Sequence, residues 1–351
     1  MLSSLSSNVV LAKARAKYGK RLKEKDYRNL LDCKSVAEVA AYLKANTDYH
    51  DVLTGINEYD IHRGQLEVLI KQKLFYNLSS FVRYELSVGE QLADYVIARA
   101  EIEEILDALM LMSAGRQEEY SQAAPLYLAK HTKIHMEQFS SLQTYGDFLD
   151  ALGSSVYRRL LDPFEPKPGE PVDVFAVENQ LYSYLFSHVQ EIIDHRVRGK
   201  TKKEVRELFQ GYIDLENYAR IIRMKKRFRA HPEFIEKNLL PFGSLKPKQL
   251  NALIHAETAN QAAAIFRTTS RGKKTANVEY NFVDELAQRI KFISGKHYIH
   301  FSSHPPVVLL SYIFLADTEV HNITTIVEGI RSQVSVDDIK KLLILPTDKA
   351  G

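Results

Sequence analysis

The stretch Asp214-Leu-Glu-Asn-Tyr-Ala-Arg-Ile-Ile-Arg223 decides the fold class, because related versions of it stand at two other places in the chain. Glu319-Val-His-Asn-Ile-Thr-Thr-Ile-Val-Glu328 has the same order: an acid first, Asn fourth, and apolar residues fifth and eighth. Glu101-Ile-Glu-Glu-Ile-Leu-Asp-Ala-Leu-Met110 keeps the acid and the apolar positions, with Glu104 in place of Asn. Residues three or four positions apart share one face of a helix, so each copy is predicted to be helical.

A second landmark recurs with the same period. The leading acids Glu101, Asp214 and Glu319 are 113 and 105 residues apart. Helix-capping pairs, in which the first side chain accepts from free amides and the second reaches back, begin at positions 109 and 114 residues apart. The caps are Ser35 with Glu38, Thr144 with Asp147, and Thr258 with Gln261. Two landmarks in one order predict an all-α protein of three similar helical units, 1–116, 117–227 and 228–351.

The polar residues of the repeated motif have two interpretations. Neighbouring acids such as Asp214 and Glu216 resemble a catalytic pair. Their return at equivalent places argues for structure instead, because acids near a helix start satisfy free amides and favour the positive end of the helix dipole. An Asn three residues further on is expected to bond to a neighbouring segment. The residues predicted to hold the repeat together are Glu101, Glu104, Asp214, Asn217, Glu319 and Asn322.

The composition describes an ordinary soluble globular chain of 351 residues, 45% hydrophobic and 26% charged. Its few residues of Gly (15) and Pro (11) suit long helices. A net charge of +3 is too small to indicate nucleic acid, and a single Cys33 excludes a disulfide framework. The longest apolar run, Val307–Ala316, is shorter than the ~18 residues of a membrane span and is predicted to be a buried core helix. No secretory signal is visible, so a role at a membrane would be peripheral, through partners.

The motifs of catalytic and metal sites are incomplete. Gly199-Lys-Thr201 resembles the end of a phosphate loop but lacks the upstream Gly that such a loop needs. His131 and His135 have the spacing of zinc ligands on a helix, without the Glu that a hydrolytic site places between them. The sequence therefore predicts no catalytic residues, no metal and no cofactor.

Charge is distributed unevenly along the chain. The segment Arg196–Arg229 has a local charge of +8, and Asp94–Glu119 has a local charge of −5. A charge run is usually a solvated face, but this asymmetry also suits a body that docks partners in one orientation. The candidate partner-binding residues come from a basic amphipathic helix expected over 9–31 and from the basic segment: Lys13, Arg15, Lys17, Lys20, Arg21, Arg196, Arg198, Lys200, Lys202 and Lys203.

The segment Tyr27-Arg-Asn-Leu-Leu-Asp-Cys-Lys-Ser-Val-Ala-Glu-Val-Ala-Ala-Tyr-Leu43, followed by Thr47-Asp-Tyr49, resembles the N-terminal signature of one family. This family is the stalk-to-rotor component of V/A-type rotary ATPases, known as the C subunit in bacteria and archaea and as the d subunit in eukaryotes. Asp214–Asn217 and Glu319–Asn322 are similar to its other landmarks, and the resemblance spans the whole chain. Glu104 departs from the Asn of the other two copies, so the first copy is the weakest.

The resemblance implies a pseudo-threefold funnel of three helical domains. Its narrow side would sit on the membrane proteolipid ring at the cytoplasmic face, and its open side would receive the central-shaft subunits. The protein would transmit torque for ion transport and catalyse no reaction. One alternative is a helical-repeat adaptor unrelated to rotary ATPases, although such repeats are usually ~34–47 residues long and numerous. A helical enzyme is a second alternative, which requires a pocket of converging polar groups.

Overall fold

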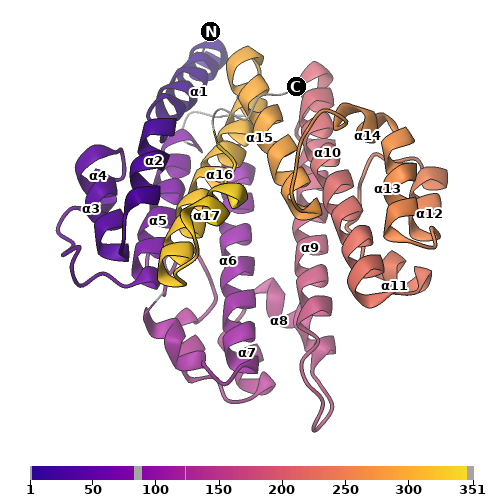
Figure 1. Ribbon diagram of the computed structural model, residues 1–351, viewed down its shortest axis with the longest axis horizontal. Coiled ribbons are helices and arrows are strands. Elements are labelled where there is room, and N and C mark those ends of the chain that lie inside the picture. The colour runs from indigo at the N-terminus through magenta and orange to yellow at the C-terminus, as the bar shows by residue number, and fades with distance from the viewer. Residues whose placement is uncertain (1, 83–88, 123, 346–351) are drawn as a thin grey trace.

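The computed structural model describes residues 2–82, 89–122 and 124–345. Within these ranges the chain consists of helices and their connections, with no β-strand, so the predicted all-α class is confirmed (Figure 1). The body is a set of long helices that run through the centre of the molecule. They are α1 (Leu2–Gly19), α5 (Arg63–Val82), α6 (Gly89–Ser113), α9 (Val174–His195), α10 (Gly199–Arg223), α15 (Val283–Phe301) and α16 (Pro305–Arg331).

Short helices lie around the flanks of this body (Figure 1). On one flank are α2 (Glu24–Asp32), α3 (Val36–Asn46) and α4 (His50–Leu53), with α17 (Val336–Leu342) close by. The 3₁₀ helices η1 (Gln117–Gln122), η2 (Met136–Ser141) and η3 (Asp162–Phe164) accompany α7 (Tyr145–Ala151) and α8 (Val156–Leu161). The other flank holds the π-helical turn η4 (Met224–Phe228), α11 (Pro232–Lys237), α12 (Pro247–Ile254), α13 (Ala259–Thr268) and α14 (Ser270–Lys274).

Helix α16 is the element on which much of the body packs. Its first half, from Pro306 to Leu315, is buried all round, as expected of a helix that is apolar on every side. It contacts α1, α5, α10, α15 and α17. Gly295 allows α15 to approach it closely, because a Cβ there would lie 3.0 Å from Cγ of Leu315. The predicted buried helix over Val307–Ala316 is therefore confirmed.

Each flank has its own apolar core. The core of α2, α3 and α4 includes Ile323 and Ile326 of α16 and Ile339 of α17. The core of α11, α12 and α13 includes Tyr218 and Ile221 of α10. The core of η2, α7 and α8 is continuous with that of the long helices. Each group of short helices is thus fastened to a long helix by burial of apolar side chains, the main favourable term in folding.

The single basic helix expected over 9–31 is wrong, because α1 ends at Gly19 and α2 begins at Glu24. Two backbone amides between these helices have acceptors outside a helical ladder. The N–H of Leu22 donates to Glu319 at 2.7 Å, and the N–H of Lys23 donates to Asp26 at 2.7 Å. A continuous helix would use these amides for its own hydrogen bonds. The bond from Leu22 to the distant Glu319 therefore favours a break between α1 and α2.

The three predicted caps make similar bonds. Ser35, Thr144 and Thr258 accept through their hydroxyl oxygens from the backbone amide three residues on, at 3.1–3.2 Å. The returning side chain in each case accepts from the amide one residue before the cap. In these bonds the amide of Lys34 donates to Glu38, that of Gln143 to Asp147, and that of Glu257 to Gln261. Asp147 alone also accepts from the cap residue's own amide, at 2.9 Å.

Candidate functional site

Two asparagines of the repeated motif bind a peptide group in the same way. Asn217 on α10 donates to the carbonyl of Leu240 at 2.8 Å and accepts from the amide of Leu240 at 2.7 Å. Asn322 on α16 donates to the carbonyl of Ile344 at 2.7 Å and accepts from its amide at 3.0 Å. Each side chain thus satisfies the donor and the acceptor of one buried residue's backbone. The return segment stands 22 or 23 residues further along in both cases.

The leading acids of the motif lie inside α6, α10 and α16, so the expected place near a helix start is wrong. They hold neighbouring segments instead. Asp214 accepts from the amides of Ser244 at 2.7 Å and Leu245 at 3.1 Å, and from the Ser244 hydroxyl. Glu101 accepts from the hydroxyls of Thr132 at 2.5 Å and Tyr157 at 2.8 Å. These bonds tie α10 and α6 to the short segments that follow them in the chain.

The partners of Glu319 precede it in the sequence, whereas those of Asp214 and Glu101 follow them. Its carboxylate accepts from the amide of Leu22 at 2.7 Å and from the hydroxyl of Tyr49 at 2.9 Å. Both partners precede it by about 270 residues or more. The first group of short helices, with the cap at Ser35, therefore packs on the last motif helix. These contacts join the expected units 228–351 and 1–116, whose boundaries stay a prediction.

A charged trough runs between the long helices and is the candidate functional site. It consists of three adjoining cavities of about 650, 250 and 290 Å³. The first two share Glu67 and Lys71 on α5, and the last two share Arg99 on α6 and Asp317 on α16. Elements far apart in the sequence, from α5 to α16, thus contribute to one concave surface.

The floor of this trough is a buried ionic network. Asp317 pairs with Arg99 and, at 3.2 Å, with Lys291 of α15. Arg99 also reaches Glu103 at 3.1 Å, and the Lys291 ammonium lies 4.8 Å from the ring centre of Phe314. Burial alone would raise the pKa of Asp317, but Arg99 and Lys291 outweigh it and lower that pKa. The network thus links the long helices α6, α15 and α16 through ion pairs that line the trough.

Comparison with known proteins shows the family of the chain. The sequence model of the ATP synthase (C/AC39) subunit family matches residues 10–342. The chain belongs to this family. It is also similar to the C subunit of the A-type ATP synthase of Methanosarcina acetivorans, with 26% identity over 300 residues, 81% of this chain and 72% of that protein. The resemblance found in the sequence is confirmed. Since the family is a structural subunit of ATP synthases, the chain is a non-catalytic member of such a complex.

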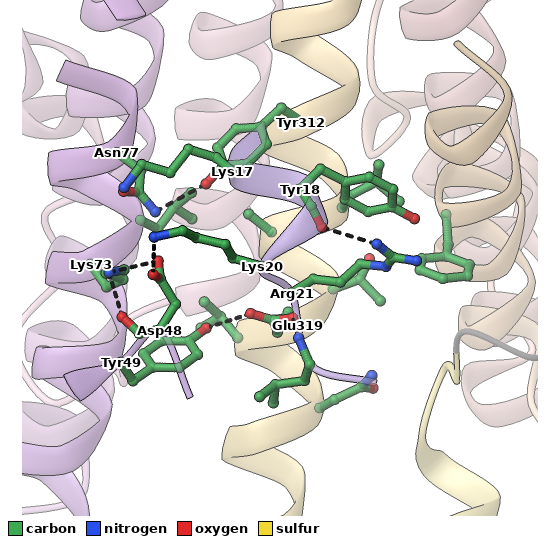
Figure 2. A pocket seen from close by; sticks show the side chains of 18 of the residues that line it. Lys17, Tyr18, Lys20, Arg21, Asp48, Tyr49, Lys73, Asn77, Tyr312 and Glu319 are labelled. Carbon is green, nitrogen blue, oxygen red and sulfur yellow. Dashed lines mark hydrogen bonds and ion pairs between the residues drawn. The ribbon is translucent and has the colours of Figure 1, made fainter. Parts of the chain in front are cut away.

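Three of the basic residues predicted to bind partners line one cavity in this C/AC39 subunit, with their head groups on different sides of it (Figure 2). Lys17 and Lys20 lie beside Asp48, and Arg21 lies over the ring of Tyr18, with its Cζ 4.1 Å from the ring centre. Arg15 has an internal role instead, because it donates to the carbonyls of Ile299, His300 and Ser302 at the end of α15. Lys13 lies on the same helix α1 and is partly buried.

The second predicted set lies where α9 ends and α10 begins, at the upper end of the bundle in Figure 1. Arg196, Arg198, Lys200 and Lys203 are exposed there. Lys202 is half-buried and pairs with Asp194 at 3.0 Å. A partner could therefore reach four cations of this set while the pair between Lys202 and Asp194 stays intact.

Sequence patterns missed the network of Arg99, Lys291 and Asp317. Each residue is surrounded in sequence by ordinary helical residues, and no motif links them. The only available signal was that Asp317 directly follows the buried apolar run that ends at Ala316. An acid that close to a core helix needs a cationic partner, but nothing in the sequence shows which one.

Glu104 takes the place of Asn in the first copy of the motif. Because its carboxyl group is buried, we expect the free energy of unfolding to depend on pH. Glu104 is 6% exposed and accepts from the Tyr120 hydroxyl at 2.7 Å. Burial raises its pKa to about 7, although Lys71 and Tyr120 act in the opposite direction. Between its unfolded pKa of about 4.5 and 7, the folded state alone holds the proton, so stability falls as pH rises. The full change is about 3 kcal/mol.

Denaturation with urea at several pH values checks this expectation. Glu104→Gln keeps an acceptor for Tyr120 but removes the charge, so the fall in stability between pH 5 and 7 should become shallower. The exposed Glu118 on η1 is the matched control, and Glu118→Gln should leave the slope unchanged. Equal slopes in the wild type and in Glu104→Gln would show that the buried carboxyl does not hold its proton.

Proposed function

We propose that this protein couples a central shaft to the membrane proteolipid ring of a rotary ATP synthase and passes torque between them. Membership of the family indicates that the protein is part of an ATP synthase complex. The observation that supports the coupling role is the charged trough, which is lined by the ion pairs of Asp317. A part that transmits torque needs a stiff body and two partner surfaces. No helix in the described ranges is long and apolar enough to cross a membrane. The protein would sit at the cytoplasmic face, held there by its partners.

The proposed shape is a funnel of three similar units around a pseudo-threefold axis. The motif helices α6, α10 and α16 each hold a group of short helices through the acids Glu101, Asp214 and Glu319. The bond from Glu319 back to Leu22 would close the ring of units. Closure supports rigidity, because opening one junction would break an interface between the two ends of the chain.

The two partner surfaces are assigned from charge and position. The trough, with acids and bases interspersed, would receive the foot of the shaft. The exposed cations Arg196, Arg198, Lys200 and Lys203 would face the ring, at the upper end of the long helices in Figure 1. Charges of one sign on an exposed end favour one orientation of docking. The alternative of an adaptor unrelated to rotary ATPases has no support, given the family of the chain.

Purification of the tagged protein from its host in mild detergent tests the proposal. The wild type should bring down proteolipid and shaft subunits with ATPase activity. Lys200→Glu with Lys203→Glu should reduce recovery of the ring, because both side chains are exposed and the change reverses their charge. Arg116→Glu with Glu119→Arg exchanges an exposed pair at the edge of the trough and should reduce recovery of the shaft.

Circular dichroism and thermal melting of each isolated variant are the controls, and both should match the wild type. Full recovery of the complex by both variants at moderate salt would contradict the assignment of the two surfaces. Reproducible capture of unrelated partners without proteolipid would contradict the coupling role itself.

A further inference from the structure

The three groups of short helices differ in charge. The group formed by η4 and α11 to α14, residues 224–274, contains eleven Lys and Arg residues and three Asp and Glu residues, a net charge of +8. The groups at residues 24–53 and 117–164 each contain four basic and six acidic residues, a net charge of −2. A partner that recognises positive charge would therefore distinguish one group from the other two, although all three are fastened to long helices.

The turn at the start of this group concentrates the charge. Residues 226–229, the basic turn, expose four consecutive side chains, those of Lys226, Arg227, Phe228 and Arg229. The three cationic side chains form no ion pair within the described part of the chain. Phe228 is 72% exposed and contacts no other aromatic ring among the described residues. Arg and aromatic side chains are the ones that most often anchor protein interfaces, so the basic turn has the composition of a docking site.

The backbone of the basic turn is fixed, although its side chains are exposed. Met224, just before it, is buried in the core of this group. Lys225 is partly buried, and its ammonium donates to the carbonyls of Ile254 at 2.7 Å and Ala256 at 2.5 Å. Arg229 ends the turn with a left-handed φ of 46°, a conformation that residues other than Gly seldom adopt. A partner would therefore meet side chains on an ordered backbone, which lowers the entropic cost of binding.

The basic turn is remote from the cations assigned to the ring. Those cations stand where α9 ends and α10 begins, whereas the basic turn lies beyond the last residue of α10, Arg223. A helix of 25 residues is about 37 Å long, so one small contact cannot cover both clusters. Figure 1 shows α11, the next helix after the turn, on the flank of the body. The basic turn is thus a separate surface.

We propose that the basic turn docks an acidic segment of another polypeptide, one that also carries an apolar side chain. The acids of that segment would supply the counter-ions that the three cations lack within the described chain, and its apolar side chain would cover Phe228. A membrane surface or a nucleic acid presents negative charge over a wider area. The exposed Glu233 and Glu236 of α11, which follow the turn closely, would repel such a surface, whereas a short acidic segment can end before them.

Photocrosslinking of the full-length protein in its own host tests the proposal. With p-benzoyl-phenylalanine in place of Phe228, we expect a crosslink to another polypeptide. Mass spectrometry of the joined peptides should locate a segment rich in Asp and Glu. The matched control carries the same photoreactive residue in place of Tyr59, which is 84% exposed between α4 and α5 and lies outside the basic group. This control should not crosslink to that segment.

Charge reversal shows whether the cations hold the partner. Lys226→Glu with Arg227→Glu should lower the yield of the crosslink about tenfold or more, because the acids of the partner then meet like charge. Lys133→Glu with Arg159→Glu reverses two exposed cations of the second group and should leave the yield unchanged. A synthetic peptide of the crosslinked segment should bind the isolated protein, as measured by fluorescence anisotropy, and should respond to the two pairs of changes in the same way.

Three results would overturn the proposal: a crosslinked segment without an excess of acids, equal effects of the two pairs of charge reversals, or no more crosslinking at Phe228 than at Tyr59. Crosslinks to lipid or nucleic acid alone would overturn it as well. The coupling role depends on recovery of the proteolipid ring and the shaft, whereas an acidic segment of any polypeptide supports the docking surface. Either proposal can therefore fail without the other.

Discussion

Asp317→Asn is expected to lower the free energy of unfolding by about 3–5 kcal/mol, the usual cost of leaving buried charges without their partner. Asp317 is the shared counter-ion of Arg99 and Lys291, whose side chains are 26% and 6% exposed. The loss of the partner should affect Lys291 more than Arg99. Burial already lowers the pKa of Lys291, and Asp317 opposes that effect. Urea denaturation followed by far-ultraviolet circular dichroism measures the change.

Two controls distinguish this result from a general loss of packing. Glu119→Gln breaks the exposed pair between Arg116 and Glu119 and should change stability little. A triple variant, Arg99→Met with Lys291→Met and Asp317→Leu, removes the whole network and should recover most of the stability that Asp317→Asn loses. If the single and triple variants were equally unstable, the network would not be the reason for the loss.

The triple variant also bears on function. A hydrophobic replacement can restore stability, yet it would remove charges that line the trough. We therefore expect the triple variant to fold but to recover less of the shaft in purification from its host. Stability and assembly would then be separable at this site.

The fold class could be predicted from the sequence because it depends on local patterns. The copies of the motif at Glu101, Asp214 and Glu319 and the caps at Ser35, Thr144 and Thr258 report helical periodicity and helix starts, which are properties of neighbouring residues. The all-α class followed from these signals, whereas the family was suggested by the resemblance of Tyr27–Leu43 and the motif copies to a known signature. The break between α1 and α2 did not follow, because it depends on Glu319, which lies 297 residues from Leu22.

The candidate sites were harder to predict for the same reason. The trough gathers Glu67, Arg99, Lys291 and Asp317 from four helices, and no spacing in the sequence records which helices become neighbours. The basic residues of α1 looked alike in sequence but differ in the fold. Arg15 binds carbonyls at the end of α15, whereas Lys17 has no acceptor in the described chain. Charge type can be read from a sequence, but the partner of a charge is a tertiary property.

The second large effect is expected at the two asparagines of the motif. Asn217→Ala and Asn322→Ala each leave the backbone of one buried residue, Leu240 or Ile344, without its donor and its acceptor. At about 1–3 kcal/mol for each unsatisfied buried group, the two groups exposed in each variant should cost about 2–6 kcal/mol. Asn251→Ala, at an exposed position on α12, is the matched control and should cost little.

Local hydrogen exchange separates a specific loss from a general one. Asn322→Ala should speed amide exchange at Leu343 and Ile344, which follow α17, more than at Leu240. Asn217→Ala should have the reverse effect, because its bonds hold the segment at Leu240. Since the two asparagines lie on different helices and share no partner, their effects on stability should add in the double variant. Additive losses with separate exchange patterns would mean that each asparagine fastens its own segment independently. Strong coupling between Asn217 and Asn322 would mean that the two segments open together, as the proposed ring of units requires.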